Sequence, residues 1–351
     1  MSREKLEPEV ETKRISLSTQ TSEVFSSHIE PISQEVPRPK WSIMIPTYNR
    51  TVYLEQTLQS VLQQIPNLDD VQIEVIDNCS TQGEPERLVE KFGKNKISFY
   101  RQSYNVGLVG NLNTCIRRAR GHLVHILHDD DLVLPGFYSR LEKAFEQEPT
   151  IGAAFCHYAH VDENNHQRYL PKLQRNTPGI ISNWLEQIAV EQQVQPPAIV
   201  VRRSAYEKLG GFNVELTHTT DWEMWKRIAA YYPVWYEPAT LAYYREHSTA
   251  DSRSSIKSGE NLVDLRKAIE CSKLYLSQPI VDNLSKKASE RAALWGLLVA
   301  RRALSRGDTS TAINQIREAL KCSFSMKVIG ALSFLPIMAV LGFLKNNRKI
   351  K

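Results

Sequence analysis

Residues 123–131 read Leu-Val-His-Ile-Leu-His-Asp-Asp-Asp, a short apolar run followed directly by three carboxylates. The apolar part, Leu123–Leu127, has the length and composition of a buried central strand, so the acids would emerge at its carboxyl end. In an open parallel sheet, that end is where ligands bind. His125, inside the run, is expected to be a core histidine with satisfied ring nitrogens rather than a ligand.

Three adjacent carboxylates repel one another unless a cation or hydrogen-bond donors compensate their charge. A hard divalent ion such as Mg²⁺ or Mn²⁺, carrying a phosphorylated substrate, is one such compensator. The alternative is a solvated acidic turn that begins the next helix. Residues 129–131 alone leave both interpretations open.

Strand-like and helix-like segments alternate on both sides of this stretch. Apolar side chains recur on one face of residues 52–64 and of residues 108–120, at the spacing of amphipathic helices. Residues 84–93 and 221–231 are also expected to be helical. This β-α-β alternation predicts an α/β fold with a doubly wound, mostly parallel sheet. Its strands are expected at Trp41–Ile45, Val71–Asp77, Ile97–Arg101, Leu123–Leu127, Gly152–His157 and Thr240–Glu246.

The 351-residue chain has ordinary globular composition, with 42% hydrophobic and 24% charged residues, and is long enough for a catalytic domain with an appendage. Six basic residues and no acids lie in residues 321–351, so the rest of the chain is close to neutral despite the net charge of +5. A neutral body argues against nucleic-acid binding. The five cysteines are dispersed without a CxxC pair, which indicates a reducing compartment and neither disulfides nor a zinc site.

Composition divides the chain into parts. Residues 1–38 are rich in Glu, Ser, Thr and Pro and are expected to be disordered or loosely attached. The α/β domain is expected over residues 39–256, and a helical extension over residues 257–325. A helical hairpin within residues 290–321, turning at Gly307, is expected to pack on the catalytic domain or on a partner.

Residues 326–351 combine an apolar helix with a basic tail. Val328–Leu344 has 17 residues without a charge and would span about 25 Å as a helix, slightly short of the hydrocarbon core of a bilayer. The basic tail suits an anionic cytoplasmic leaflet, so shallow or in-plane membrane association is favoured over a packed helix or a true span. No N-terminal apolar run resembles a signal peptide, so a cytoplasmic location at the inner face of the plasma membrane is expected.

Six short motifs run through the chain in a fixed order, and most of them follow a predicted strand or begin a predicted helix. Together they resemble the family 2 glycosyltransferases with the GT-A fold, over roughly residues 41–250. One such motif would be a weak signal, but six in order are a strong one. The motifs are Ile45-Pro46-Thr47-Tyr48-Asn49-Arg50, Ile76-Asp77-Asn78-Cys79-Ser80, Asn105-Val106-Gly107 with Asn113, Ala119 and Gly121, His128-Asp129-Asp130-Asp131 with Pro135, Gly210-Gly211-Phe212 with Thr220-Asp221, and Tyr244-Arg245-Glu246-His247.

The resemblance implies a Rossmann-like nucleotide-diphospho-sugar transferase fold, a nucleotide-sugar donor and a divalent metal ion, Mg²⁺ or Mn²⁺, beside its diphosphate. Asp130 is expected to hold the metal, with Asp131 and His247 as further ligands. Asp77 is expected to accept a hydrogen bond from the nucleobase, or alternatively to cap the turn that follows it. The full set of expected donor-binding residues is Pro46, Tyr48, Asn49, Asp77, Asn105, Gly107, Asn113, Asp129 and Arg245.

On the acceptor side, the resemblance implies that Asp221 is the general base of a single, inverting displacement. The alternative is that Asp221 caps the helix over residues 221–231. Trp222 and Trp225 are candidates for an acceptor platform, although one of them is expected to be core. Two positions depart from the family pattern: His128 stands where many members carry an Asp, and Thr220 where they carry a Glu.

The implied activity is transfer of a sugar to a hydroxyl of a glycan or lipid-linked acceptor, in the synthesis of cell-surface polysaccharide. A sugar-phosphate nucleotidyltransferase is an alternative, but no Gly-rich loop with Lys or Arg follows the first strand. A non-catalytic scaffold that uses the helical hairpin is a second alternative. The intact triplet and Asp221 argue against it.

Overall fold

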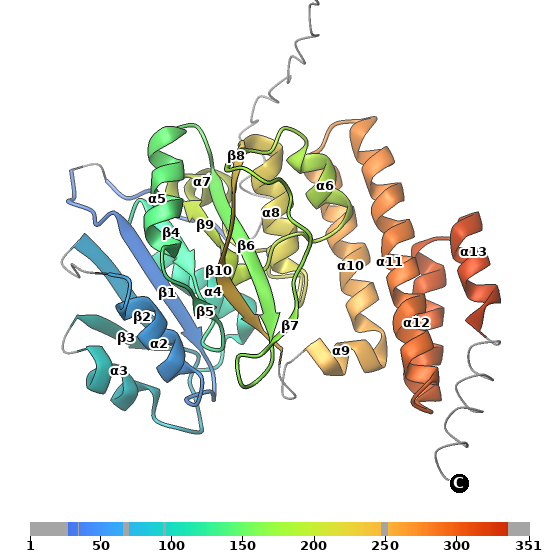
Figure 1. The fold of residues 1–351 in the computed structure, drawn as a ribbon, viewed down its shortest axis with the longest axis horizontal. Coiled ribbons are helices and arrows are strands. Elements are labelled where there is room, and N and C mark those ends of the chain that lie inside the picture. Colours follow the sequence, from blue (N-terminus) through green and yellow to red (C-terminus); the bar gives the residue numbers. More distant parts are fainter. Residues whose placement is uncertain (1–26, 34, 66–69, 94–95, 247–251, 336–351) are drawn as a thin grey trace, which may run out of the picture.

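The structure, a computed structural model, describes residues 27–33, 35–65, 70–93, 96–246 and 252–335. These residues form an α/β domain with a row of helices beside it (Figure 1). Ordered structure begins before residue 38, because Ile29 is fully buried in the main hydrophobic core. The expected boundary of the disordered segment is therefore too late, and residues 1–26 of that segment lie outside the described residues.

A ten-stranded mixed sheet forms the centre of the described α/β domain, in the order β3-β2-β1-β4-β9-β6-β10-β5, with β7 paired to β6 and β8 to β10. Strands β1 to β4 run parallel to one another, and β6 runs parallel to β10. The prediction of an α/β, mostly parallel sheet is confirmed. The strands are β1 (Trp41–Thr47), β2 (Val71–Asp77), β3 (Ile97–Arg101), β4 (Leu123–Ile126), β5 (Leu132–Val133), β6 (Ala153–Val161), β7 (Gln167–Tyr169), β8 (Gly179–Ile180), β9 (Ile199–Arg202) and β10 (Val234–Arg245).

Strand β9 was not expected from the sequence. It lies antiparallel between β4 and β6 and follows α6 (Trp184–Val190) and a 3₁₀ turn at Pro196–Ala198. Four residues are too few to show a strand period, and the partners of β9 are distant in sequence. Its insertion places β4 in the interior of the sheet, where all four of its residues are buried.

Helices connect the strands and pack on the sheet. Helix α4 (Gly107–Arg118) packs on β1, β2 and β4, and α5 (Phe137–Gln147) packs on β6 and β10. The apolar residues Leu112, Cys115 and Ile116 of α4 are buried as their spacing predicts. The remaining helices of this domain are α2 (Leu54–Leu62), α3 (Pro85–Gly93), α7 (Arg203–Leu209) and α8 (Thr220–Tyr231).

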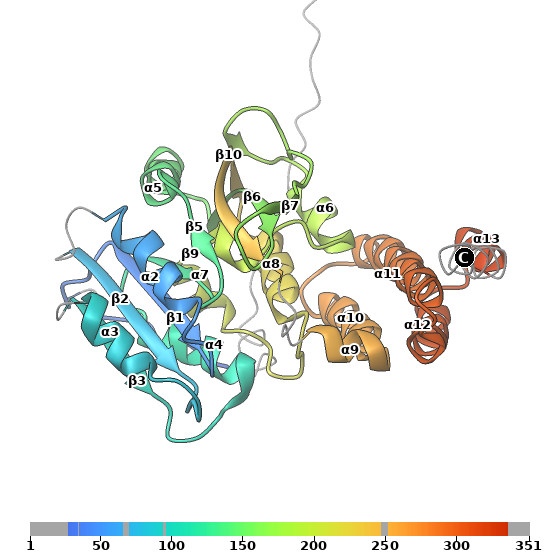
Figure 2. The ribbon, with the colours of Figure 1, turned by 60° about the horizontal axis from the view of Figure 1, so that its bottom comes forward.

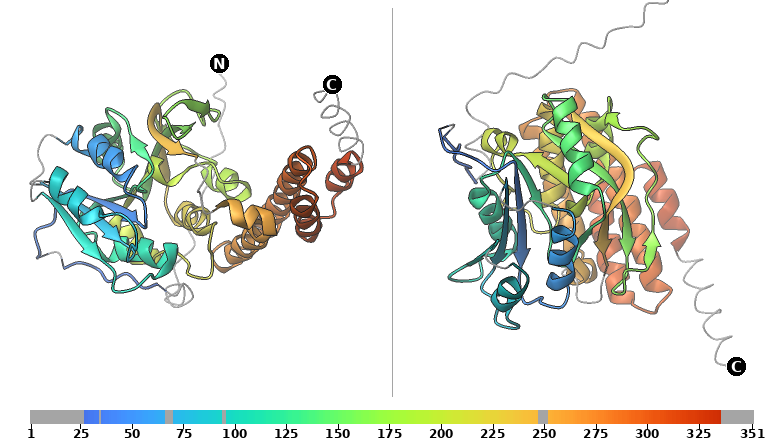
Figure 3. Two further views of the ribbon diagram at one scale, coloured as in Figure 1. Left: turned by 90° about the horizontal axis from the view of Figure 1, so that it is seen from below. Right: turned by 60° about the vertical axis from the view of Figure 1, so that its left-hand side comes forward.

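The helical extension packs directly on the α/β domain. Figures 2 and 3 show its helices in a row to one side of the sheet, and α10 contacts α8 while α11 contacts α6. Helices α11 and α12 form the expected hairpin, and Asp308 caps α12 by accepting a hydrogen bond from the Thr311 N–H at 3.0 Å. The elements are α9 (Ser252–Ser258), α10 (Glu260–Cys271), a 3₁₀ turn at Ser272–Leu274, α11 (Ile280–Leu304), α12 (Thr309–Cys322) and α13 (Met326–Ser333).

Helix α13 covers the start of the expected apolar helix, and residues 336–351 lie outside the described residues. Val328 and Leu335 are buried in a cluster with residues of α10 to α12, whereas Met326, Ile329 and Phe334 are exposed. Among the helices that the structure describes, none has both the length and the apolar character needed to cross a membrane.

Candidate active site

The polar segments that follow β1, β2 and β4 meet at one edge of the sheet. Thr47 at the end of β1 pairs with Asp77 at the end of β2, and Met44 pairs with Ile126 near the end of β4. Because the three strands are parallel, their carboxyl ends leave the sheet together. The Asp129–Asp131 triplet therefore lies beside the loop that follows β1.

Thr47 and Arg50 hold the first two carboxylates of the triplet. The Thr47 hydroxyl donates to Asp129 Oδ2 at 2.6 Å. Arg50 Nη1 lies 2.5 Å from Asp130 Oδ2 and 3.6 Å from Asp129 Oδ1. Sequence reasoning gave Arg50 no role of its own, although it ends the first motif, and the structure adds it to the site.

Arg245, the last residue of β10, holds the third carboxylate and the backbone of the loop. Its N–H donates to Asp131 Oδ1 at 2.9 Å, and its Nε donates to the carbonyl of Asp130 at 2.7 Å. Further guanidinium donors bind the carbonyl of Glu163 and the side chain of Gln56. In this structure Arg245 shapes the triplet loop, and its expected contact with the donor stays a prediction.

The triplet is buried rather than solvated, since Asp129, Asp130 and Asp131 are only 4%, 8% and 1% exposed. Burial raises the pKa of Asp129 to about 8 and raises the pKa of Asp131 well above its usual range, and the charge of Asp130 adds to both shifts. Arg50 and Thr47 act in the opposite direction on the pKa of Asp129. The buried triplet is therefore short of positive charge, and the interpretation as a solvated acidic turn is wrong.

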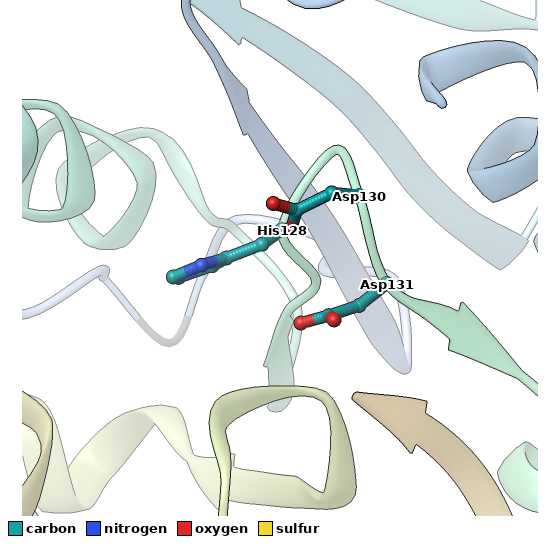
Figure 4. Close-up of side chains that lie close together, drawn as sticks. All are labelled: His128, Asp130 and Asp131. Carbon is teal, nitrogen blue, oxygen red and sulfur yellow. The ribbon is translucent and has the colours of Figure 1, made fainter. Parts of the chain in front are cut away.

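The residues around the triplet fit a divalent metal ion. His128, Asp130 and Asp131 each offer one ligand atom, and these atoms lie within 4.8 Å of one another (Figure 4). Asp131 Oδ2 is buried and has no hydrogen-bond partner among the described residues, so an anionic oxygen is available to a cation. His128 was not expected to be a ligand; its only signal was the departure from the family pattern. His247 lies outside the described residues.

Asp77 is fully buried and its carboxylate is occupied within the protein. Oδ1 and Oδ2 accept from the Ser80 N–H at 3.2 and 3.1 Å, and Arg101 Nη1 lies 3.0 Å from Oδ2. These contacts correspond to the alternative interpretation, a cap for the turn after β2. A hydrogen bond from Asp77 to a nucleobase stays a prediction.

The loop after β1 is tied to the loop after β2 through Asn49. Its side-chain carbonyl accepts from the Thr81 and Gln82 N–H groups at 2.7 and 3.0 Å, and its own N–H donates to Ser80 Oγ at 2.8 Å. Asn49 thereby holds the two loops together, and its backbone has a positive φ of 54°. Next to it, Tyr48 is 41% exposed, which leaves its ring accessible to a ligand. Pro46 is buried inside β1 and can contribute only backbone to a donor site.

Asn105 and Gly107 organise the start of α4. Asn105 Oδ1 accepts from the Gly107 N–H at 2.8 Å and from the Asn78 side chain at 2.9 Å, while Asn78 Oδ1 accepts from the Val106 N–H. Gly107 has a φ of 75°, a conformation that favours glycine. The motif thus joins β2 to α4, at the sheet edge that carries the triplet.

Asn113 is placed differently from the other expected donor-binding residues. It is 1% exposed, its Nδ2 donates to the Phe212 carbonyl at 2.9 Å, and its Oδ1 accepts from the Phe212 N–H at 2.7 Å. A Cβ at Gly211 would collide with Asn113 Oδ1, so any other residue there would displace the Asn113 side chain. In this structure Asn113 anchors the Gly211-Phe212 segment and does not line the cavity.

Asp221 lies in the first turn of α8 but does not cap it, because the helix begins at Thr220 and its cap position is Thr219. Gln192 Nε2 donates to Asp221 Oδ2 at 2.6 Å, and the Trp222 N–H donates to Oδ1 at 2.8 Å. Burial raises the pKa of Asp221 to about 6, and these two hydrogen bonds limit the rise. A carboxylate with this pKa can accept a proton near neutral pH.

A residue of the helical extension orders the loop that leads to Asp221. Asp264 of α10 accepts from the N–H groups of Thr217, His218 and Thr219 at 3.1, 2.8 and 2.8 Å, and also from the Thr219 hydroxyl. A carboxylate at a helix N-terminus is favoured by the helix dipole. Sequence reasoning missed Asp264, since nothing near it in the chain marks its contact with this loop.

Trp222 and Trp225 are both core residues, at 2% and 4% exposed. The Trp222 indole donates to the Ile188 carbonyl at 2.6 Å, and Trp225 packs edge-on against Phe212. Both touch the wall of the cavity, but neither presents an open face. The exposed aromatic ring of this wall is Trp295 of α11, which sequence reasoning did not select.

One cavity of about 550 Å³ joins these groups. Its lining includes Arg50, His128, Asp130 and Arg245 near the sheet edge, Asp221 with its neighbours on α8, and residues of α9 to α11. The same cavity is thus lined by potential metal ligands, His128 and Asp130, and by a carboxylate of raised pKa, Asp221. This combination suits transfer of a group from an anionic leaving group to a hydroxyl.

Comparison with known proteins agrees with this geometry. Residues 42–210 match the sequence profile described as Glycosyl transferase family 2. A GalNAc(5)-diNAcBac-PP-undecaprenol beta-1,3-glucosyltransferase of Campylobacter jejuni is 36% identical over 112 residues, which cover 31% of this chain and 35% of that enzyme.

Two solved structures share the fold. Staphylococcus aureus TarS 1–349 in complex with UDP-GlcNAc superimposes with a TM-score of 0.64 at 15% identity, covering 87% of this chain and 89% of that one. The mannosyltransferase PcManGT of Pyrobaculum calidifontis, in complex with GDP-Man and Mn²⁺, gives a TM-score of 0.57 at 19% identity, covering 93% and 85%. With these motifs and this sheet order, residues 42–210 are a family 2 glycosyltransferase domain, and the α/β domain that contains them has the GT-A fold.

Proposed function

We propose that the protein is an inverting, metal-dependent glycosyltransferase that moves a sugar from a nucleotide-diphosphate sugar to a hydroxyl of a glycan or lipid-linked acceptor. One observation carries the proposal: Asp130 and Asp221 line the same cavity, the first within a cluster that is short of positive charge and the second with a pKa raised to about 6. A diphosphate with its cation belongs at the first site, and an attacking hydroxyl belongs at the second.

His128, Asp130 and Asp131 are the residues that would hold a divalent ion, Mg²⁺ or Mn²⁺. Such an ion, when bound, stabilises negative charge on the leaving diphosphate. Arg50 adds a permanent positive charge on the cavity wall beside Asp130. The Mn²⁺ in the complex of PcManGT supports this assignment.

Asp221 would act as the general base. As the acceptor oxygen forms its bond to the anomeric carbon, the bond from that carbon to the diphosphate oxygen breaks, the nucleoside diphosphate leaves with the electron pair, and the hydroxyl proton passes to Asp221. Attack and departure on opposite faces invert the anomeric configuration. Gln192 and the Trp222 N–H hold the carboxylate in place for this transfer.

The acceptor is proposed to belong to cell-surface polysaccharide synthesis. The Campylobacter relative supports this, because its name specifies a glycan carried on undecaprenyl diphosphate. We place the enzyme at the cytoplasmic face of the plasma membrane through residues 326–351. The exposed Met326 and Ile329 of α13, the exposed Phe334 that follows it and the basic tail support that location.

The test is incubation of the full chain with UDP-, GDP- and dTDP-sugars and Mn²⁺ or Mg²⁺, with and without an acceptor extract. Release of nucleoside diphosphate that depends on metal and on Asp130, together with a product of inverted configuration by NMR, is the expected result. Release of pyrophosphate would identify a nucleotidyltransferase instead. Metal-independent donor binding without turnover, unchanged in Asp130→Ala, would identify a scaffold.

A further inference from the structure

The helical extension forms part of the cavity wall beside Asp221. Figure 2 shows α8 between the sheet and the helices α9 to α11, and Asp264 of α10 fastens the loop before α8. Seven side chains of the extension line the cavity, from Ser255 on α9 to Trp295 on α11. The extension therefore completes the site and is more than an appendage.

The position of this wall assigns it to the acceptor. Under the proposed function, the donor diphosphate lies near Asp130 and Arg50, and the attacking hydroxyl lies near Asp221. The part of the cavity that α9 to α11 line is then left for the portion of the acceptor beyond its reactive hydroxyl.

The chemistry of the wall selects what that portion can be. Five of its seven side chains are apolar: Ile256, Leu265, Ala288, Ala292 and Trp295. A sugar ring buried here would lose water from several hydroxyls and find few partners, which is unfavourable. An alkyl chain gains by burial against the same side chains. The Nδ2 of Asn261, which lacks a partner among the described residues, can donate to a single oxygen.

The geometry points to an amphiphilic acceptor: its reactive hydroxyl is presented to Asp221 and an alkyl chain next to it packs on α10 and α11. This inference rests on the proposed function and narrows its acceptor to the lipid-bearing class. Trp295, exposed at 38%, is the aromatic side chain that such a chain would cover on entering.

The experiment compares methyl and n-octyl β-D-glucopyranoside as probes, below the micelle-forming concentration, binding to the full chain with UDP and Mn²⁺ by calorimetry. Each buried methylene strengthens binding by about fourfold, so entry of even two gives the octyl probe an advantage of at least about tenfold. Equal affinity for the two probes would overturn the inference.

Two variants decide whether the alkyl chain binds on this wall. Ala292→Leu narrows the cavity beside this wall, and Trp295→Ala removes the exposed ring of the wall. Each should reduce the ratio of octyl to methyl glucoside affinity at least about threefold. Lys287→Leu, on the exposed side of α11, adds apolar bulk outside the cavity and should leave the affinity ratio of the two probes unchanged. An undiminished advantage in Trp295→Ala, which removes a partly exposed side chain and should still fold, would overturn the inference.

Failure of the proposed function gives a different result. Thermal shift by UDP-, GDP- and dTDP-sugars reports on the donor site alone, because bound ligand raises apparent stability. If no nucleotide sugar raises the melting temperature of the wild-type protein, the proposed function fails whether or not the glucosides bind. If a donor binds and the octyl probe has no advantage, only the acceptor inference fails.

Discussion

The Asp129–Asp131 triplet and Asp221 line one cavity but differ in how their charge is compensated. The triplet gathers three carboxylates around Arg50 and Arg245, and the pKa values of Asp129 and Asp131 are still raised, to about 8 at Asp129. Asp221 is a single carboxylate that accepts from the neutral donors Gln192 and the Trp222 N–H, and its pKa rises only to about 6. The first arrangement calls for a further cation, whereas the second is suited to exchange a proton.

The largest expected effect comes from the triplet. Asp130→Ala removes a ligand and the partner of Arg50, so we expect kcat/KM to fall about 10⁴-fold and the response to added Mn²⁺ to disappear, since metal stabilisation of the leaving group is worth several kcal/mol. Steady-state assays over a metal titration measure both. Asp282→Ala, an exposed acid on α11, is the matched control. Retained metal activation in Asp130→Ala would contradict the assignment.

The next effect comes from Asp221. Asp221→Asn keeps the size of the side chain and one of its two acceptor oxygens, but the amide cannot take the proton, so kcat should fall about 10³-fold. The thermal shift that the nucleotide sugar causes should be unchanged, because the proposed donor site lies at the triplet. Single-turnover rates measure the chemical step and donor-binding curves measure donor affinity, so together they separate a loss of catalysis from a loss of binding. Full activity in this variant would exclude Asp221 as the base.

The pH dependence should distinguish the two regions further. The base must be unprotonated, so kcat should rise with pH and level off above an apparent pKa near 6, and at pH 4 it should be about 100-fold below its plateau. A pH–rate profile at saturating donor and metal measures this limb. In Asp221→Asn the residual rate should lose the limb near pH 6, and its persistence there would mean that another group titrates.

The smallest effect concerns Gln192, the uncharged hydrogen-bond donor to Asp221. The Gln192 hydrogen bond favours the charged form of Asp221 and lowers its pKa, so Gln192→Leu should raise that pKa and move the acidic limb upward. Loss of a hydrogen bond worth about 1 kcal/mol lowers the rate roughly fivefold at pH values on the acidic limb. Gln193→Leu is the neighbouring control. A limb that moves downward, or not at all, would show that Gln192 does not control this carboxylate.

Much of the α/β domain could be predicted from the sequence because its signals are local. The strands at residues 41–45, 71–77 and 97–101, and the core histidine His125, agree with the structure; His125 bonds the Tyr138 hydroxyl and the Pro197 carbonyl, and burial lowers its pKa to about 3. Placement of the triplet after a strand also followed from a local pattern. The partners of each carboxylate did not.

Prediction failed where a contact joins distant parts of the chain. Asn113 fits a donor motif by spacing, yet it binds Phe212, 99 residues away. Trp222 and Trp225 were selected for their aromatic rings, but the packing of α8 turns both into the core. Trp295 and Asp264 reach the site only because the extension folds back on α8, which no pattern around either residue records.

The sequence by itself determined most of the succession of strands and helices along the chain, the carboxylates at a strand end and the family of the domain, because periodicity and motif spacing are properties of neighbouring residues. Only the tertiary structure decided that Arg50 pairs with Asp130, that His128 joins Asp130 and Asp131, and that α9 to α11 wall the cavity. The reason is physical: the charge, burial and partners of a side chain depend on groups brought together across the fold, and these set the pKa values on which the proposed chemistry depends.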